Sequence, residues 1–318
     1  MKAFVLDGFG SVENLVEKDI VIPSVKEDEV LIKVKAISIN PVDVKTVKGK
    51  GAWGKLKELN PIILGWDVSG TVTEAGTAVT DFKVGDEVFG MVNFPGHGQA
   101  YAEYVAAPAA HLALKPANIS HDEAAAASLA ALTAYQALVS HAHIREGDRV
   151  LIHAAAGGVG HYAVQIAKHF GAYVIGTSSA ENREFVLEIG ADEHVDYKTQ
   201  RFEDVLNDID FVLDTIGGDN IDRSLLVVKK GGTVISIPSG LSEEVVEKAK
   251  VKGVNGYFFM VHSDGHDINK IASLLDQEII KSHVSKVFSF HELRAAHAQV
   301  ATGKTKGKVV VNLTGLTL

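Results

Sequence analysis

Short apolar runs, many of them alternating with polar residues, fill about the first 115 residues of the chain. Turn-forming residues such as Asp7-Gly8, Gly76 and Pro95-Gly96 separate these runs. Frequent β-branched residues and a period near two are typical of strands that lie on a half-buried surface. The pattern therefore predicts a β-rich unit of barrel or sandwich type. Its expected strands are Lys2–Leu6, Glu29–Ala36, Val68–Ala75, Glu87–Val92 and Tyr101–Ala106.

Near residue 120 the pattern changes to helices that alternate with strands. Ser120 and Glu123 match a capping box, which predicts the start of an alanine-rich helix that runs to about His141. Amphipathic segments then follow at Val159–Phe170 and Glu181–Ile189. Strands that are separated by one helix each indicate a parallel, doubly wound sheet. The expected strands are Arg149–Ala154, Tyr173–Thr177, His194–Asp196, Phe211–Asp214 and Thr233–Ile237.

The C-terminal segment predicts one more helix and one more strand. Ser289 and Glu292 form a second capping box, and Gly303 ends the helical pattern that follows it. The apolar run Lys308–Asn312 then predicts a final strand.

Composition narrows the class of protein. A chain of 318 residues, 46% apolar and 22% charged, predicts about two domains of an ordinary globular protein. Its net charge of −9 argues against nucleic acid as a main partner. The chain has no cysteine, which excludes disulfides, a thiolate nucleophile and zinc sites with sulfur ligands. Its most apolar stretch, Ala124–Leu132, is too short to span a membrane, and we expect a cytoplasmic protein with no membrane partner.

A glycine-rich turn joins the first of the later strands to its helix. In Ala155-Ala-Gly-Gly-Val-Gly160, Gly157 would let the backbone approach a pyrophosphate, and Gly160 would let helix and strand pack closely. The N–H groups at the start of the helix would donate to phosphate oxygens. Ala155 replaces the first glycine of G-x-G-x-x-G, so a purely structural turn is the alternative. The residues expected to bind the cofactor here are Ala156, Gly157, Gly158 and Val159.

The end of the second strand of this βαβ unit favours NADPH over NADH. NAD-binding proteins place a carboxylate there for the ribose 2′-hydroxyl, whereas this strand ends in Gly176-Thr-Ser-Ser179. Ser178, Ser179 and Arg183 are therefore expected to receive a 2′-phosphate. Glu181 is an acidic neighbour, and a solvated helix residue is the alternative reading of Arg183.

Seven motifs give the chain a resemblance to a known family. They are Ile39–Asp43, Gly65–Gly70, Phe82–Gly90, Leu132-Thr-Ala134, Ala154–Gly160, Gly190–Asp192 and Thr302–Val310. In these motifs, over nearly its whole length, the chain resembles the medium-chain dehydrogenase/reductase superfamily, in its zinc-free quinone oxidoreductase and enone reductase branch. The resemblance implies an α/β protein: a GroES-like β-rich substrate domain at 1–120, completed by 265–318, and a Rossmann cofactor domain at 121–264. It also implies a homodimer.

The resemblance further implies four catalytic candidates. Zinc-dependent members hold zinc with a cysteine and a histidine in the regions that match Asn40 and Trp66, so no metal is expected here. The Asn40 amide could donate to a substrate carbonyl, with Asp43 as its partner. Trp66 could wall the substrate cleft, and Thr133 could lie beside the nicotinamide. The alternatives are turn residues for Asn40 and Asp43, a core residue for Trp66 and ordinary helix packing for Thr133.

Six more residues complete the cofactor site that the resemblance implies. Tyr197 corresponds to a position near the 2′-phosphate. Ile216 and Pro238 follow the fourth and fifth strands, where loops line the cofactor crevice. At the end of the sixth strand, Phe258, Phe259 and Met260 are expected to hold the carboxamide through their backbone, unless they are plain core.

The expected function is hydride transfer from NADPH to a quinone or an α,β-unsaturated carbonyl without a metal. Without a Lewis acid, ionising an alcohol near neutral pH is difficult, whereas an electron-poor carbon accepts hydride directly. Two alternatives share the same cofactor residues: a non-catalytic NADPH-binding sensor or structural protein, and a zinc-independent alcohol or aldehyde reductase.

Overall fold

The computed structural model describes residues 1–238 and 241–315, which form two compact units. Unit 1 comprises residues 1–132 and 262–315, and unit 2 comprises residues 133–238 and 241–261. The family resemblance implies boundaries at 120 and 264 instead. The first boundary differs because helix α3 (His121–Tyr135) begins among the strands of unit 1 and crosses into unit 2.

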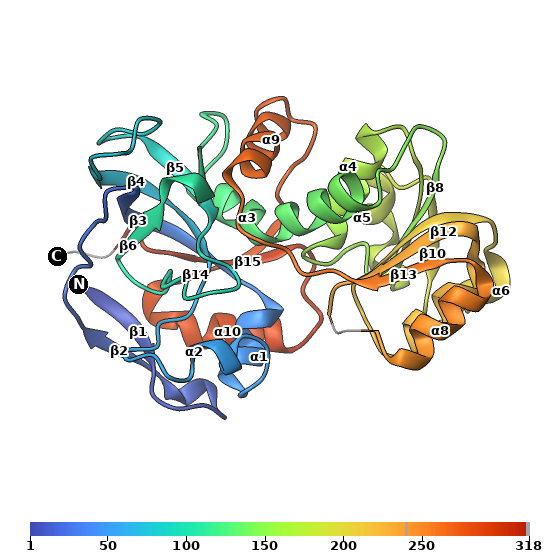
Figure 1. Ribbon diagram of the computed structural model, residues 1–318, viewed down its shortest axis with the longest axis horizontal. Coiled ribbons are helices and arrows are strands. Elements are labelled where there is room, and N and C mark those ends of the chain that lie inside the picture. Colours follow the sequence, from blue (N-terminus) through green and yellow to red (C-terminus); the bar gives the residue numbers. More distant parts are fainter. Residues whose placement is uncertain (239–240, 316–318) are drawn as a thin grey trace. The chain divides into compact units, whose positions relative to one another are not determined.

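Unit 1 is built around strand β3 (Glu29–Ile39), which pairs with β4, β6 and β15. Its main sheet has the order β14-β15-β3-β4-β5-β7, with β6 also on β3, and β1 and β2 form a separate antiparallel pair (Figure 1). The other strands are β1 (Lys2–Leu6), β2 (Leu15–Asp19), β4 (Asp67–Ala75), β5 (Glu87–Met91), β6 (Tyr104–Pro108), β7 (Leu112–Leu114), β14 (Val284–Ser289) and β15 (Lys308–Asn312). The helices are α1 (Pro41–Val47), α2 (Trp53–Leu56), the first part of α3, α9 (Gly265–Asp276) and α10 (Leu293–Ala301).

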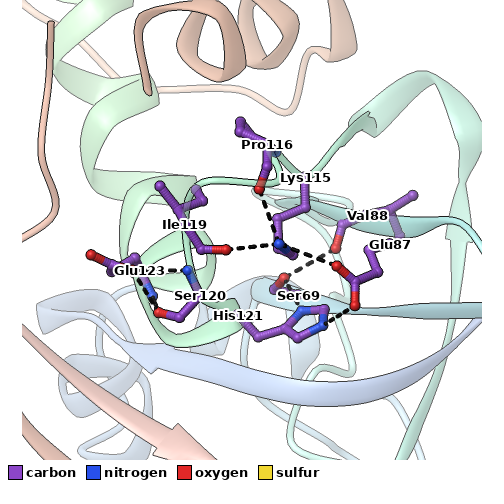
Figure 2. Close-up of polar contacts among 9 residues, drawn as sticks. All are labelled: Ser69, Glu87, Val88, Lys115, Pro116, Ile119, Ser120, His121 and Glu123. Atoms are coloured by element: carbon purple, nitrogen blue, oxygen red, sulfur yellow. Dashed lines mark hydrogen bonds and ion pairs between the residues drawn. The ribbon is translucent and has the colours of Figure 1, made fainter. Parts of the chain in front are cut away.

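A cluster of polar side chains anchors the first turn of α3 to the sheet of unit 1 (Figure 2). His121 Nδ1 lies 2.8 Å from Ser69 Oγ, and its Nε2 lies 3.1 Å from Glu87 Oε1. Lys115 Nζ pairs with the other oxygen of Glu87 at 3.2 Å. Ser69 Oγ is fully buried and also contacts the Val88 carbonyl at 3.1 Å, so this Ser–His–Glu group is a structural clamp rather than a nucleophilic site.

Unit 2 is a six-stranded parallel sheet with the order β10-β9-β8-β11-β12-β13. This order, with a helix between successive strands, is that of a doubly wound dinucleotide-binding sheet. Figure 1 shows α8 beside β13 at one edge. The strands are β8 (Arg149–Ile152), β9 (Tyr173–Ser178), β10 (Glu193–Asp196), β11 (Ile209–Asp214), β12 (Val228–Ser236) and β13 (Asn255–Phe258). The helices are α4 (Gly160–His169), α5 (Arg183–Glu188), α6 (Phe202–Val205), α7 (Asp219–Val227) and α8 (Glu243–Lys252).

The core of unit 2 forms where α6, α7 and α8 cover the sheet. Side chains from these helices, such as Phe202, Leu225 and Val245, pack in one buried cluster with Val212 and Val234 of the central strands. Burial on both faces explains why the strands are apolar throughout rather than alternating.

The elements follow the sequence pattern, with a few differences. Both capping boxes are present, at Ser120/Glu123 and Ser289/Glu292. Strands β2, β7 and β14 and helices α1, α2 and α9 are not predicted. Strand β7 has only three residues, and β2 and β14 each have only one buried position. The alanine-rich helix does not run uninterrupted to His141: α3 ends at Tyr135 and a π-helical turn spans Gln136–His141. In the described part of the chain, no helix combines the length and apolar character needed to cross a membrane.

Candidate functional site

Strand register brings four polar residues of unit 1 together. Val309 lies opposite Ile39, so the antiparallel register continues to place Lys308 opposite Asn40. Ala36 lies opposite Ser69, and the same register brings Ser38 opposite Asp67. Asn40, Asp67 and Lys308 are far apart in the sequence, yet all three are buried at this one place.

The side-chain amide of Asn40 is held in one orientation. Its Oδ1 accepts a hydrogen bond from Lys308 Nζ at 2.5 Å, and its Nδ2 donates to Asp67 Oδ2 at 2.7 Å. Because an ammonium can only donate and a carboxylate can only accept, the oxygen and nitrogen of the amide cannot exchange places. The second N–H of Nδ2 has no partner among the described residues. Asn40 therefore retains one fixed donor.

Asp67 is the centre of this cluster. Besides Asn40, its carboxylate accepts from Ser38 Oγ and from the backbone N–H of Leu129 in α3, both at 2.8 Å. Lys308 Nζ lies 3.8 Å from Oδ2. Burial raises the pKa of Asp67 and lowers the pKa of Lys308, while their opposite charges and the donors around Asp67 act against both shifts. With this set of donors we treat the pair as charged.

Asp43 lies beside this cluster with an incompletely satisfied carboxyl group. Its Oδ2 accepts from the backbone N–H of Asn40 at 2.7 Å, at the start of α1. Its Oδ1 is buried and has no hydrogen-bond partner among the described residues. The Tyr101 hydroxyl lies 2.9 Å from His297 Nε2, and Tyr101 lowers the pKa of the same carboxyl group. Burial raises the pKa of Asp43 to about 7.

The raised pKa of Asp43 predicts an unusual pH dependence of stability. Between the ordinary pKa of 3.8 and about 7, the folded state binds a proton that the unfolded state does not. The contribution of Asp43 to the free energy of unfolding is therefore largest below pH 3.8. This contribution falls by about 4 kcal/mol as the pH rises to 7. Asp43→Asn should remove this loss, so that the stability difference between variant and wild type grows with pH. Denaturant unfolding of both proteins from pH 4.5 to 8 measures it, and parallel curves would contradict the prediction.

The structure places the other two catalytic candidates inside buried packing. Trp66 is fully buried, donates from Nε1 to the Gly96 carbonyl at 2.7 Å and packs edge-on against Phe94. This is the core position that was the alternative for Trp66, and the ring offers no exposed face to a planar substrate. Thr133 is a buried residue near the end of α3 and is the first residue of unit 2.

In unit 2, the glycine-rich turn has the close packing that a phosphate-binding turn needs. A Cβ on Gly160 would lie 2.2 Å from the Ala154 carbonyl oxygen and 2.8 Å from Ala155 Cα. A Cβ on Gly157 would lie 3.1 Å from the same oxygen. Ala154 itself adopts a positive φ of 48° to make the turn. Gly157, Gly158 and Val159 remain partly exposed just before α4, whereas Ala156 is buried. This geometry fits a dinucleotide pyrophosphate.

The carboxyl ends of β9 and β10 gather hydroxyl and basic groups. Ser178 and Ser179 are buried, and Arg183, which follows them in the chain, is exposed. Tyr197 is also exposed, and its backbone N–H donates to the Ser178 carbonyl at 3.2 Å. Ser178 Oγ lies 2.8 Å from His194 Nε2. The side chains of β9 that end here carry hydroxyls and no carboxylate, which fits a 2′-phosphate better than a 2′-hydroxyl.

Asp214 shapes the loop after β11. Its buried carboxylate accepts from the backbone N–H groups of Ile216 and Gly217 and from Asn220 Nδ2 at 2.9–3.2 Å, and from Ser236 Oγ at 2.8 Å. As a result Ile216 stands exposed at the carboxyl edge of the sheet. Of the remaining candidates, Pro238 is half-buried, Phe258 and Met260 are exposed, and Phe259 is buried.

Sequence reasoning does not find the roles of Asp67, Lys308, His194 and Asp214. The sequence signals for these roles are weak. Asp67 and Lys308 lie inside two of the family motifs, but they are 241 positions apart in a chain of 318 residues. Only the register of the sheet brings them together. No group of three His, Asp or Glu residues that could hold a metal ion occurs among the described residues.

Comparisons with known proteins agree with this architecture. Residues 26–117 match the alcohol dehydrogenase GroES-like domain, and residues 189–311 match the zinc-binding dehydrogenase family. The chain is 36% identical to 2-methylene-furan-3-one reductase of Solanum lycopersicum and 36% identical to the chloroplastic NADPH-dependent alkenal/one oxidoreductase of Arabidopsis thaliana. Each alignment covers 98% of this chain and 79% of the relative. The solved quinone oxidoreductase of Coxiella burnetii superposes with a TM-score of 0.93 at 36% identity, covering 98% of this chain and 99% of that one.

Proposed function

This chain belongs to the quinone oxidoreductase branch of the medium-chain dehydrogenase/reductase superfamily, and we propose that it reduces quinones or α,β-unsaturated carbonyls with NADPH. The observation that carries the proposal is the Asn40 amide, fixed by Lys308 and Asp67 with one N–H left over. We assign substrate binding to unit 1 and cofactor binding to unit 2. The support for the second assignment is the close-packed turn at Gly160 and the hydroxyl-lined end of β9.

The residues of unit 1 can stabilise the charge that this reduction creates. Reduction of an activated double bond takes up one hydride, which bound NADPH supplies, and one proton, which comes from solvent water. Negative charge then develops on the carbonyl oxygen of the substrate, and the free N–H of Asn40 would donate to that oxygen. Because Lys308 and Asp67 hold the amide in advance, the donor needs no reorganisation during the reaction. The Asp43 carboxyl group also holds Asn40 in place, because it accepts a hydrogen bond from the backbone N–H of Asn40.

In unit 2, the residues of the turn and of the strand ends would hold the cofactor. The backbone around Gly157 and Gly158 would bind the pyrophosphate at the start of α4. Ser178, Ser179, Arg183 and Tyr197 would surround the 2′-phosphate. Thr133, Ile216, Pro238 and the segment from Phe258 to Met260 are the remaining proposed cofactor contacts.

A substrate panel tests the function. NADPH oxidation is followed with a cyclic enone, a benzoquinone and a saturated aldehyde, each with and without a strong chelator. We expect turnover of the enone or the quinone that persists under chelation. Turnover of the aldehyde at least as fast as of its unsaturated analogue would identify an aldehyde reductase instead. Tight NADPH binding without turnover of any compound would favour a sensor or structural role.

We further propose a homodimer that forms through the edge of unit 2. Strand β13 ends the hydrogen-bonded order of the described strands, and Phe258 at its end is exposed. An unpaired strand edge is a ready template for a second copy. Sedimentation equilibrium measures the mass in solution, and a monomer at all concentrations would contradict the proposal. The cytoplasmic location stays a prediction for fractionation to test, because relatives include a chloroplastic protein.

A further inference from the structure

His194 is a titratable residue at the proposed 2′-phosphate position that the reaction does not use. It lies in β10, which runs parallel to β9, and its Nε2 reaches across to Ser178 Oγ at 2.8 Å. Ser178 Oγ is also 3.1 Å from the Ser179 carbonyl, its only other hydrogen-bond partner among the described residues. Since a serine hydroxyl has one proton, donation to that carbonyl leaves Ser178 as an acceptor for His194.

We propose that His194 is a specificity-determining residue for NADPH: it becomes a cation when the 2′-phosphate binds beside Ser178, and it thereby favours the phosphorylated cofactor over NADH. This inference rests on the proposed function only in placing the cofactor in unit 2. It makes the preference for the 2′-phosphate grow toward acid pH, which a site with arginine alone does not do, because arginine is charged at every pH of interest.

The charges around His194 support this role. Burial lowers the pKa of His194, Arg183 of α5 lowers it further, and Asp196 of β10 itself raises it. The imidazole is therefore neutral at neutral pH before the cofactor binds. A 2′-phosphate, with a charge of about −1.5 to −2 near pH 7, would pair with Arg183 and favour the imidazolium. The nearby acidic residue Glu181 is exposed and forms an ion pair with Lys198 at 3.5 Å, so it does not add an unpaired negative charge beside the phosphate.

The linkage has a definite sign. If the phosphate raises the pKa of His194 on binding, binding takes up a proton. Affinity for the phosphorylated ligand then rises as pH falls from the bound pKa to the free pKa, by tenfold for each unit between them. A ligand that has only a 2′-hydroxyl gains nothing over the same range.

The test uses the full chain and two adenosine fragments, so it does not depend on turnover. The pKa of His194 is measured by NMR of its ring in the free protein, with 2′,5′-ADP and with 5′-AMP. Calorimetry gives the affinity for both fragments from pH 5.5 to 8.5. We expect 2′,5′-ADP, and not 5′-AMP, to raise the pKa of His194 by at least one unit. The preference for 2′,5′-ADP should then grow about tenfold toward acid pH.

Two variants provide the contrast. His194→Gln keeps a donor at the position of Nε2 but cannot titrate, so only the pH dependence of the ligand phosphate itself should remain. Arg183→Gln should weaken binding of 2′,5′-ADP at every pH instead. A pKa of His194 that is the same with both fragments, or a preference for 2′,5′-ADP that still grows toward acid pH in His194→Gln, would overturn the proposal. If neither fragment binds, both the proposal for His194 and the assignment of the cofactor to unit 2 are wrong. If the fragments bind but enones and quinones are not turned over, only the proposed reaction is wrong.

Discussion

Replacement of Asn40 by alanine is expected to lower kcat for enone or quinone reduction by about 10²–10³, which is the usual loss for one donor to a developing oxyanion. The expectation follows from the fixed orientation of the amide between Lys308 and Asp67. A donor held in advance acts mainly in the transition state, so kcat should fall more than KM rises.

Two measurements separate this effect from damage to the fold. The affinity for NADPH should stay within about threefold of wild type, because the proposed cofactor residues lie in unit 2. Asn207→Ala, at an exposed asparagine, is the matched control and should behave as wild type in both assays. Asn40→Ala with undiminished kcat and an intact fold would remove Asn40 from the reaction, and with it the main support for the proposed function.

Gly160→Ala is expected to weaken NADPH binding by about 30–100-fold. The new Cβ would meet backbone atoms at 2.2 and 2.8 Å, and these cannot rotate away as a side chain could. Relief requires α4 to move away from β8, which displaces the N–H groups that would face the pyrophosphate. Cofactor binding would have to restore the crowded geometry, and overpacking of this kind costs about 2–3 kcal/mol, which gives the expected change in affinity.

Graded controls are available for this substitution. Gly157→Ala should have a smaller effect, because its Cβ would lie 3.1 Å from the nearest atom. Gly54→Ala in α2 meets nothing within 4 Å and should leave binding unchanged. Fluorescence titration with NADPH measures all three. Wild-type affinity in Gly160→Ala would mean that the turn does not bind the cofactor.

Local signals in the sequence were sufficient for much of the fold. The capping boxes at Ser120 and Ser289 work within four residues, and the structure has both. The apolar strands of unit 2 are recognisable because burial on both faces leaves no polar alternation. The interruption of the long helix after Tyr135 is not recognisable in this way, because an alanine-rich segment is compatible with either kind of helical turn.

The candidate site divides along the same line. Asn40 and the turn before Gly160 could be identified from motifs, and so could the absence of a carboxylate at the end of β9. The direction of the Asn40 amide could not, since it depends on Lys308, and Lys308 reaches Asn40 only through the pairing of β15 with β3. The same holds for His194, which meets Ser178 only because β10 pairs with β9.

By itself, the sequence therefore determined many of the strands and helices, that a glycine-rich turn joins β8 to α4, and which side chains are available for chemistry. The tertiary structure decided which of them are buried, which are partners and in which protonation state they are held, as for Asp43 and the Asp67–Lys308 pair. The physical reason is range. Capping, turns and periodicity act over a few residues, whereas desolvation and charge pairing depend on segments that meet only after the sheets have formed.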